Sequence, residues 1–481
     1  GDHRDLHSFP TRRSSDLGFR KFHSTATYMA EMISEIQNNV KTKTFTAGLY
    51  VDLQKAFDSV WIEGLIFKLR EIGIQGKLLK ILSWYLSHRQ TTIQVNETFG
   101  TAFNCGLGVP QGGVLSPTLF AIYINDMLSG ISGFGKCLQY ADDTSIILSD
   151  LNHIQLSEKC QSSCDKLTAW LSKWRLKANC SKTDLLVFYG NCDVPKLSGE
   201  SINKCSSTKV LGITVDEKLN FEAHLNRCKN TLSQKWNMVK PFIYKGLSVQ
   251  TSRFILLNVI MPKTHYLSFL WDFKNKFSVY SMVKDLGRIP FNPPTEHVFA
   301  FCNIQPLEIR YCQLRLSLAR SLIKSGNFSF LDSVSRSAVK DKILIDCRQY
   351  LNLRHQPNSA ELEEKLFTKA KVRKFCHDKW VKSYMNFCRS TPCCGLLDNL
   401  DLCWNVIFAN RIPLTITPKI FGSICALLTG HCRLQLHLYK LKLTFSPTCI
   451  CLMSDESPQH YLHECPLYDD VRLRSDRKSV V

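Results

Sequence analysis

Two adjacent carboxylates, Asp142 and Asp143, stand in the middle of the apolar stretch "QYADDTSIILSD" at residues 139–150. The apolar residues on both sides of the pair predict a strand, a tight turn and a second strand. A carboxylate that is removed from water costs several kcal/mol unless another group compensates its charge. This pair constrains the fold more than any other feature, because the fold must bring a partner to it.

The pair permits three interpretations: a solvated hairpin tip, a salt-bridged structural pair, or the ligands of a divalent metal. For an isolated Asp-Asp dipeptide the hairpin tip is favoured, because Asp is common in turns. A second acidic strand end changes the balance, since Asp52 closes the apolar run "GLYVDL" at residues 48–53. Acidic ends of two neighbouring strands can share Mg²⁺ ions, which prefer oxygen ligands and phosphate groups. Two such ions can activate an attacking hydroxyl group and stabilise a leaving pyrophosphate.

Hydrophobic periodicity predicts mixed α and β structure up to about residue 220 and helices from there to about residue 430. Ser24 or Thr25 is the expected cap of the first helix, and the alternating segment 91–104 predicts a hairpin that turns at Asn96–Glu97. A further helix is expected to bury one apolar stripe, made of Leu156, Cys160, Cys164, Leu167 and Leu171.

A chain of 481 residues exceeds the size of a single hydrophobic core, so two or three domains are expected. The Pro-rich segment 289–297 is the best internal boundary. Residues 1–17 and 471–481 have no periodicity and look like translated adapter sequence, with ordinary disordered tails as the alternative. We leave both ends out of the fold prediction.

Lys and Arg outnumber Asp and Glu by 61 to 41, which gives a formal net charge of +20. This excess favours a polyanionic partner, with nucleic acid first and an anionic membrane surface second. No window of 18 apolar residues exists, so a membrane-spanning helix is not expected. The 21 cysteines are scattered along a chain without an apolar signal segment, which predicts a reduced, intracellular protein.

Five motifs carry a family resemblance, and they occur in one order along the chain: "LYVDLQKAFDSVW" (49–61), "GVPQGGVLSPTLFAIYINDM" (108–127), "YADD" (140–143), "LKANCSKT" (176–183) and "VLGITVDEKLNFEAHL" (210–225). Over residues 18–470 the chain resembles the reverse transcriptases of non-LTR (LINE-type) retrotransposons, especially jockey-like elements. The resemblance implies an α/β (α+β) right-hand polymerase palm with partial fingers at 18–220. A helical thumb and connection at 221–430 and a zinc-knuckle-like segment at 431–470 would follow.

The implied activity is that of an RNA-directed DNA polymerase, which copies element RNA into DNA by target-primed synthesis. Two catalytic Mg²⁺ ions would be bound by Asp52, Asp142 and Asp143. The implied partners are the RNA template, the DNA primer at the target, deoxynucleoside triphosphates and an element-encoded nucleic-acid-binding protein, with no membrane. Synthesis would take place in the nucleus, and a ribonucleoprotein would form in the cytoplasm. Relatives carry further finger motifs and an endonuclease domain, so the chain resembles an interior part of a larger polyprotein.

Other roles follow the motifs by position. Lys182 would protonate the departing pyrophosphate, Phe57 would act as a steric gate against the ribose 2′-hydroxyl, and Gln111, Gly112 and Tyr140 would bind substrate. Three of these roles have a plainer alternative: Lys182 as a surface lysine, Phe57 as a core aromatic residue, and the loop of Gln111 and Gly112 as a helix-entry turn. Asp58, six residues after Asp52, is expected to be a capping or structural residue. Gly212 is expected at a turn or bulge of a primer-grip hairpin, and His224 is expected to be structural.

Cys449, Cys451, His460 and Cys465 form a Cys₃His set near the end of the chain, which is a known set of zinc ligands. Relatives carry a knuckle that ends in His and Cys with the same spacing. The Cys-x-Cys pair is narrower than usual, so His463 is a substitute ligand and reduced structural cysteines are the alternative. Upstream, residues 365–380 interleave basic and aromatic residues, which suits nucleic-acid binding or a solvated amphipathic helix.

Two other functions compete with the polymerase. The first is a degenerate or domesticated nucleic-acid-binding protein without polymerase activity, which the retention of all three aspartates disfavours. The second is a viral RNA-copying polymerase with a similar palm. The "PQG" motif and Phe57 disfavour it, because they favour the use of deoxynucleotides.

Overall fold

The computed structural model describes residue 18 and residues 22–271, 279–325, 338–353, 368–390 and 417–476. They belong to two compact units. Unit 1 comprises Gly1–His224, Phe269–Trp271 and Leu316–Leu366, and unit 2 comprises Leu225–Ser268, Asp272–Arg315 and Phe367–Val481. No helix among the described residues is long and apolar enough to cross a membrane.

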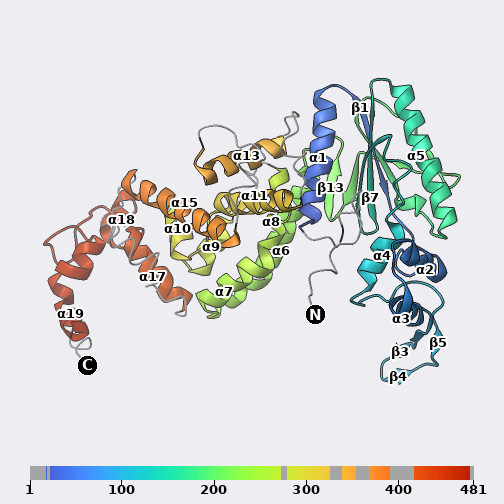
Figure 1. Ribbon diagram of the computed structural model, residues 1–481. Coiled ribbons are helices and arrows are strands. Elements are labelled where there is room, and N and C mark those ends of the chain that lie inside the picture. The colour runs from blue at the N-terminus through green and yellow to red at the C-terminus, as the bar shows by residue number, and fades with distance from the viewer. Residues whose placement is uncertain are drawn as a thin grey trace. The chain divides into compact units, whose positions relative to one another are not determined.

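A five-stranded sheet with the order β11-β8-β1-β7-β6 forms the centre of unit 1 (Figure 1). β1 (Phe45–Val51) lies between β7 (Asp143–Asp150) and β8 (Asp184–Tyr189) and is antiparallel to both. β6 (Gly135–Tyr140) is antiparallel to β7, and the short β11 (Asn203–Lys204) is parallel to β8. The mixed α and β structure expected before residue 220 is therefore present in the described residues.

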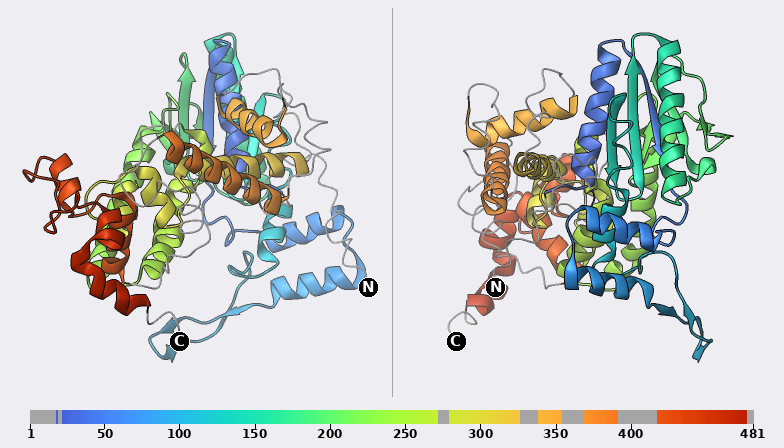
Figure 2. Two further views of the ribbon diagram at one scale, coloured as in Figure 1. Left: turned by 90° about the vertical axis from the view of Figure 1, so that its left-hand side faces the viewer. Right: turned by 45° about the vertical axis from the view of Figure 1, so that its right-hand side comes forward.

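Helices α1 (Thr25–Lys41) and α5 (His153–Lys173) cover the two faces of this sheet (Figure 2). Ser24 caps α1 in a capping box with Thr27, so the predicted helix start is confirmed. The apolar stripe that the sequence predicts, from Leu156 to Leu171, lies on α5 and is buried. Because both faces are covered, β1 is buried along nearly its whole length.

Two helices and a hairpin arm lie between the first two motifs, and a third helix lies within the second motif. α2 (Ile62–Glu71) packs against α3 (Gly76–Ser87) and against α4 (Ser116–Ile124). The arm consists of β2 (Gln90–Thr91) paired with β5 (Phe103–Asn104), and β3 (Gln94–Val95) paired with β4 (Thr98–Phe99). Val95 pairs with Thr98, which places the turn at Asn96–Glu97 as the sequence predicts.

A second hairpin follows the sheet. β12 (Ser207–Val210) pairs with β13 (Ile213–Asp216) through a two-residue turn at Leu211 and Gly212, both of which have positive φ angles (45° and 82°). Gly212 thus occupies the turn, where its missing side chain allows that backbone conformation. His224 is buried at 6 % exposure, and its Nδ1 lies 3.4 Å from the amide nitrogen of Thr214. This contact fits the structural role expected of His224.

Further short elements complete unit 1. They are the 3₁₀ turn η2 (Cys180–Lys182), β9 (Lys196–Leu197), β10 (Glu200–Ser201), the 3₁₀ turn η4 (Ser268–Leu270), which begins at the last residue of unit 2, and α13 (Ala338–Leu351). Helix α13 packs against α1.

The described part of unit 2 is helical, as the sequence predicts after residue 220. Its elements are α6 (Glu222–Tyr244), α7 (Val249–Ile255), a π-helical turn (Leu256–Ile260), α8 (Pro262–His265), α9 (Tyr280–Leu286), α10 (Thr295–Phe301), α11 (Leu307–Lys324), α15 (Lys369–Ser390), α17 (Pro418–Thr429), α18 (Gln435–Lys440), a second π-helical turn (His460–Glu464), a 3₁₀ turn (Pro466–Tyr468) and α19 (Asp469–Asp476). α6 begins in unit 1 and α11 ends there. The apolar core of unit 2 includes Leu256, Val283 and Phe421.

Helix α15 carries the basic and aromatic segment. Its buried stripe consists of Val372, Cys376, Trp380 and Tyr384, and lysines such as Lys371 and Lys374 are exposed. Trp380 is 4 % exposed and therefore cannot stack on a base. The amphipathic helix with a solvated basic face is the alternative that this geometry matches, whereas Phe367 lies outside the described residues.

Candidate active site

The register of the sheet brings the three aspartates to one end of it. Val51 pairs with Thr144, so Asp52 and Asp143 each lie one step away from this pair, at the same end of β1 and β7. Tyr140 pairs with Asp143, which leaves Ala141 and Asp142 as a two-residue turn. Ala141 has φ +55°, a left-handed conformation that costs a non-glycine residue about 1–2 kcal/mol. The fold accepts this cost in the turn that carries Asp142.

Repulsion among the carboxylates shows in the pKa of Asp143. This pKa is raised to about 6, first because the carboxyl group is buried and then because Asp142 and Asp52 repel its charge. Lys209 acts in the opposite direction. None of the ion pairs in the described residues includes any of the three aspartates. The arrangement therefore suits a cation better than it suits a self-contained salt bridge.

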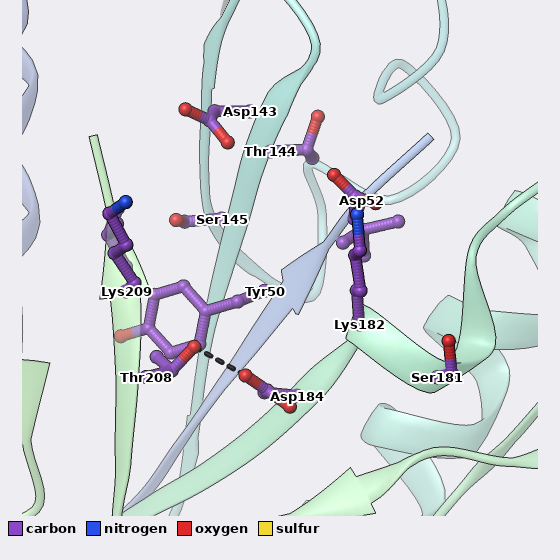
Figure 3. A pocket seen from close by; sticks show the side chains of 12 residues that line it. Tyr50, Asp52, Asp143, Thr144, Ser145, Ser181, Lys182, Asp184, Thr208 and Lys209 are labelled. Carbon is purple, nitrogen blue, oxygen red and sulfur yellow. Dashed lines mark hydrogen bonds between the residues drawn. The ribbon is translucent and has the colours of Figure 1, made fainter. Parts of the chain in front are cut away.

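A pocket beside the aspartates contains charges of both signs (Figure 3). Asp52, Asp143 and Asp184 line it together with Lys182 and Lys209. In Figure 3 the Lys182 side chain extends from η2 in the direction of Asp52. Carboxylates can hold a metal while the neighbouring lysines hold phosphate groups, so the pocket suits a metal-bound polyphosphate.

Backbone hydrogen bonds fix the positions of Asp52 and Lys182. The amide of Asp52 donates to Oγ1 of Thr183 (3.4 Å), and its carbonyl accepts from the amide of Asn179 (2.8 Å). The amide of Lys182 donates to the carbonyl of Asn179 (3.0 Å). The loop that bears Lys182 is thus tied directly to the end of β1.

Two charged residues of this pocket were not predicted from the sequence: Asp184 and Lys209. The Thr208 hydroxyl donates to Asp184 (2.5 Å), and the side-chain amide of Asn203 donates to the same carboxylate (3.4 Å). The bond from Thr208 ties the β12–β13 hairpin to the sheet and holds Lys209 near the aspartates, and the bond from Asn203 joins β11 to β8. The predicted hairpin was the available signal, but the sequence does not give its docking position.

The Gly-rich loop lies on the turn that follows Asp52. The amide of Gly108 donates to the carbonyl of Val60, and that of Val109 donates to the carbonyl of Phe57, both at 2.8 Å. Gly108 has φ +80°, and a Cβ atom there would stand 2.8 Å from Cα of Asp58. The side-chain amide of Gln111 donates to both carboxylate oxygens of Asp58 (2.9 and 3.0 Å). The loop is therefore positioned by main-chain contacts that only glycine permits at Gly108.

The other predicted substrate-binding residues do not line the aspartate pocket. The ring of Phe57 stacks on that of Phe120 with the centroids 4.5 Å apart, and it packs against the core of unit 1. The Tyr140 ring meets that of Tyr28 edge to face. Gln111 and Gly112 also lie outside the pocket lining. The structure brings Asp52, Asp143 and Lys182 to one pocket, with Asp142 next to Asp143. The functional roles of all eight residues stay predictions.

A separate cluster in unit 2 contains Cys449, Cys451, His460 and Cys465, whose ligand atoms all lie within 4.8 Å of one another. The Sγ atoms of Cys449 and Cys465 are 3.7 Å apart, and Sγ of Cys451 lies 3.1 Å from Nε2 of His460. His463 does not belong to this cluster. The four residues that the sequence predicts as zinc ligands therefore lie together in the structure.

Comparisons with known proteins agree with this geometry. Residues 4–215 match the family model described as reverse transcriptase (RNA-dependent DNA polymerase). This segment is therefore similar to reverse transcriptase domains, a family that uses divalent metal ions, typically Mg²⁺. Its homologues are RNA-directed DNA polymerases of non-LTR retrotransposons, at modest sequence identity.

Two of these relatives come from Drosophila melanogaster. The chain is 27 % identical over 228 residues to the RNA-directed DNA polymerase from mobile element jockey, covering 46 % of this chain and 25 % of the relative. It is 27 % identical over 283 residues to the probable RNA-directed DNA polymerase from transposon BS. That alignment covers 56 % of this chain and 31 % of the relative. The chain thus spans less than a third of the length of these relatives.

A third relative aligns with most of the chain, and a solved structure is compared for its fold alone. The Pol polyprotein of the R1 element of Bradysia coprophila is 21 % identical over 452 residues, which is 89 % of this chain and 41 % of the relative. Telomerase of Candida tropicalis, solved with a fragment of telomeric RNA, is 14 % identical and covers 77 % of this chain and 54 % of its own, with a TM-score of 0.35.

The raised pKa of Asp143 leads to a pH-dependent prediction. The folded pKa of about 6 lies above the ordinary 3.8, so the folded state binds the proton more tightly. The resulting stability is present below pH 3.8 and is lost as the pH rises through 6. Asp143→Asn should therefore raise the free energy of unfolding at pH 7.5 by about 1–2 kcal/mol, after allowance for partial solvent exposure, and change it little at pH 3.5.

Urea denaturation in the presence of EDTA, followed by tryptophan fluorescence at both pH values, measures this difference. Asp193→Asn is the matched control, since Asp193 is exposed and lies outside the pocket. A stabilisation by Asp143→Asn that is equal at the two pH values would contradict the electrostatic origin.

Proposed function

We propose that the chain is the reverse transcriptase part of a non-LTR retrotransposon protein and copies element RNA into DNA. The observation that carries this proposal is that Asp52 and Asp143 line one pocket with Lys182 and Lys209, inside the segment that the family model matches. Asp142 lies close enough to this pocket to repel the charge of Asp143. In the reaction, a primer 3′-hydroxyl attacks the α-phosphate of a deoxynucleotide and pyrophosphate leaves.

The three aspartates fit a site for divalent ions. They supply oxygen ligands, and their mutual repulsion, seen in the pKa of Asp143, is relieved by a bound cation. Two Mg²⁺ ions, when bound, would supply Lewis-acid activation of the primer hydroxyl and charge neutralisation on the leaving group. The protein contributes the positions of the ligands, through the β1–β7 register and the bonds that hold the backbone of Asp52.

The two lysines of the pocket would act on the phosphates. Lys182 and Lys209 enter from opposite elements, η2 and β12, so together they can hold a triphosphate against the aspartates. Lys182 is proposed as the acid that protonates pyrophosphate, a kind of help that is typically worth about 10²–10⁴-fold in rate.

Selection of the nucleotide would depend on the turn and the loop beyond Asp52. Phe57 is proposed as the steric gate, and its stacking on Phe120 gives such a gate the rigidity that it needs. The loop that carries Gln111 and Gly112 is bonded to the backbone of Phe57, so substrate binding by the loop would position the gate as well. Tyr140, at the end of β6, is proposed to bind substrate next to Asp142 and Asp143.

The proposed partners are an RNA template, a DNA primer at the target site, deoxynucleoside triphosphates and an element-encoded nucleic-acid-binding protein. The net charge of +20 supports nucleic-acid binding. Synthesis would occur in the nucleus and particle assembly in the cytoplasm. A binding protein without polymerase activity is not favoured, because it does not need three aspartates in mutual repulsion.

We also propose that Cys449, Cys451, His460 and Cys465 hold one structural Zn²⁺. A tetrahedral site with zinc–sulfur bonds of about 2.3 Å separates its sulfur atoms by roughly 3.8 Å, and the Cys449–Cys465 separation is 3.7 Å. Glu464 lies 3.7 Å from Nδ1 of His460, on the side away from the cluster, where a carboxylate orients a ligating imidazole. The amide of Met453 points at Sγ of Cys451 from 3.5 Å, which would stabilise a thiolate.

The first test removes one charge from the metal site. Asp142→Asn should lower primer extension on poly(rA)·oligo(dT) by at least about 10³-fold, because a metal ligand loses its charge. RNA binding should change little, and Asp193→Asn should change neither quantity. Substantial extension by the Asp142→Asn protein would refute the assignment of Asp142.

The gate is tested by the sugar of the incoming nucleotide. Phe57→Val should raise the ratio of ribonucleotide to deoxynucleotide incorporation on one template, because the smaller side chain leaves room for a 2′-hydroxyl. Phe103→Val, at an exposed aromatic residue of the arm, is the matched control. An unchanged ratio together with a loss of stability would mean that Phe57 is only a core residue.

Zinc is tested by elemental analysis of the purified protein. The wild type should contain about one zinc per chain, and the double variant Cys465→Ser/His460→Ala should contain none. The control Cys432→Ser/His463→Ala changes the same residue types outside the cluster and should keep the metal. Zinc that is retained by the first double variant would exclude this ligand set.

A further inference from the structure

Helices α2 and α3 enclose a groove that shares no residue with the aspartate pocket. Two hollows, of about 690 and 280 Å³, adjoin along the helices. Both are lined by Ile66, Arg70, Ser83 and Ser87, so they form one continuous groove. Figure 1 shows the two helices next to each other beyond one end of the sheet of unit 1.

The charge that lines the groove is mainly positive. Arg70, Lys80 and Lys173 contribute cations, and Glu63 is the one acidic residue of the two linings. Helix α3, "GKLLKILSWYLS", contains two lysines and no acidic residue. A cationic groove of this kind favours an anionic chain.

Exposed aromatic rings accompany these cations. Trp84 is 63 % exposed and stacks on His88 with the ring centroids 5.5 Å apart. Phe67, on the neighbouring helix, is 54 % exposed. Exposed aromatic faces beside cationic side chains are the platforms on which single-stranded nucleic acids stack their bases. A protein-binding face would instead be depleted in lysine.

The inner wall of the groove is rigid. Trp174 lines it at 6 % exposure, and Nζ of Lys68 lies 3.7 Å from the centroid of the Trp174 ring. Lys68 is itself held by an ion pair with Asp126 (2.5 Å), which also accepts from Nε1 of Trp170 (3.2 Å). A wall fixed before the ligand arrives lowers the entropic cost of binding.

We propose that this groove binds single-stranded nucleic acid. Arg70 and Lys80 hold the phosphates, bases stack on Trp84 and Phe67, and the hydroxyl groups of Ser83 and Ser87 offer hydrogen bonds. A duplex fits less well, because its bases are already stacked on one another. The inference does not depend on polymerisation, since none of the aspartates takes part.

The test measures the anisotropy of fluorescein-labelled dT20 and U20 with the whole protein, and the two probes distinguish DNA from RNA. Trp84→Ala should weaken the better-bound probe by about 5-fold or more. Arg70→Glu/Lys80→Glu should reduce the slope of log K against log salt by at least roughly 1.4. The controls are Phe99→Ala, at another exposed aromatic, and Lys41→Glu/Lys43→Glu, at two exposed lysines; neither should match these effects.

Crosslinking locates the contact. Ultraviolet irradiation with dT20 that contains 5-bromodeoxyuridine should modify the tryptic peptide "ILSWYLSHR" (81–89) in the wild type and in Asp142→Asn. Loss of polymerisation with intact crosslinking separates the two proposals. Groove variants that bind as the controls do, or adducts only outside residues 81–89, would each overturn the inference and leave the groove to a protein partner.

Discussion

The carboxylates at the ends of β1 and β7 repel one another, and the rest of unit 1 holds them together against that repulsion. The register of the two strands sets Asp52 beside Asp143, and a strained turn at Ala141 adds Asp142. A chain that folded only for stability would separate these charges or pair them with lysines. Here burial and the like charges of Asp142 and Asp52 keep the pKa of Asp143 high. The site without a cation is therefore unfavourable, and binding of a cation relieves the repulsion.

Those parts of the fold that depend on local pattern could be predicted from the sequence. The capping box at Ser24, the buried stripe of α5 and the turn at Asn96–Glu97 each follow from a few neighbouring residues. The Cys₃His cluster was also predictable, because all four residues fall within a short segment and share one ligand chemistry. In these cases the side chains that decide the structure are close together in the chain.

Features that depend on docking between distant segments could not be predicted. Lys209 lies near the aspartates because Thr208, its neighbour in β12, binds Asp184, and no periodicity in the sequence encodes that contact. The same limit applies to Asp58, whose partner Gln111 is 53 residues away. Trp380 illustrates a different limit. Tryptophan suits stacking on a base, but this residue lies on the buried face of α15.

The close approach of Gly108 to Asp58 limits which substitutions the site can tolerate. Any side chain at position 108 would collide with the Asp58 backbone, which cannot move without shifting the segment that begins at the end of β1. A related sequence could therefore keep all three aspartates and still lose the backbone geometry beside them. Among diverged sequences, a side chain at this position would mark a lost active-site geometry even where the acidic motif is intact.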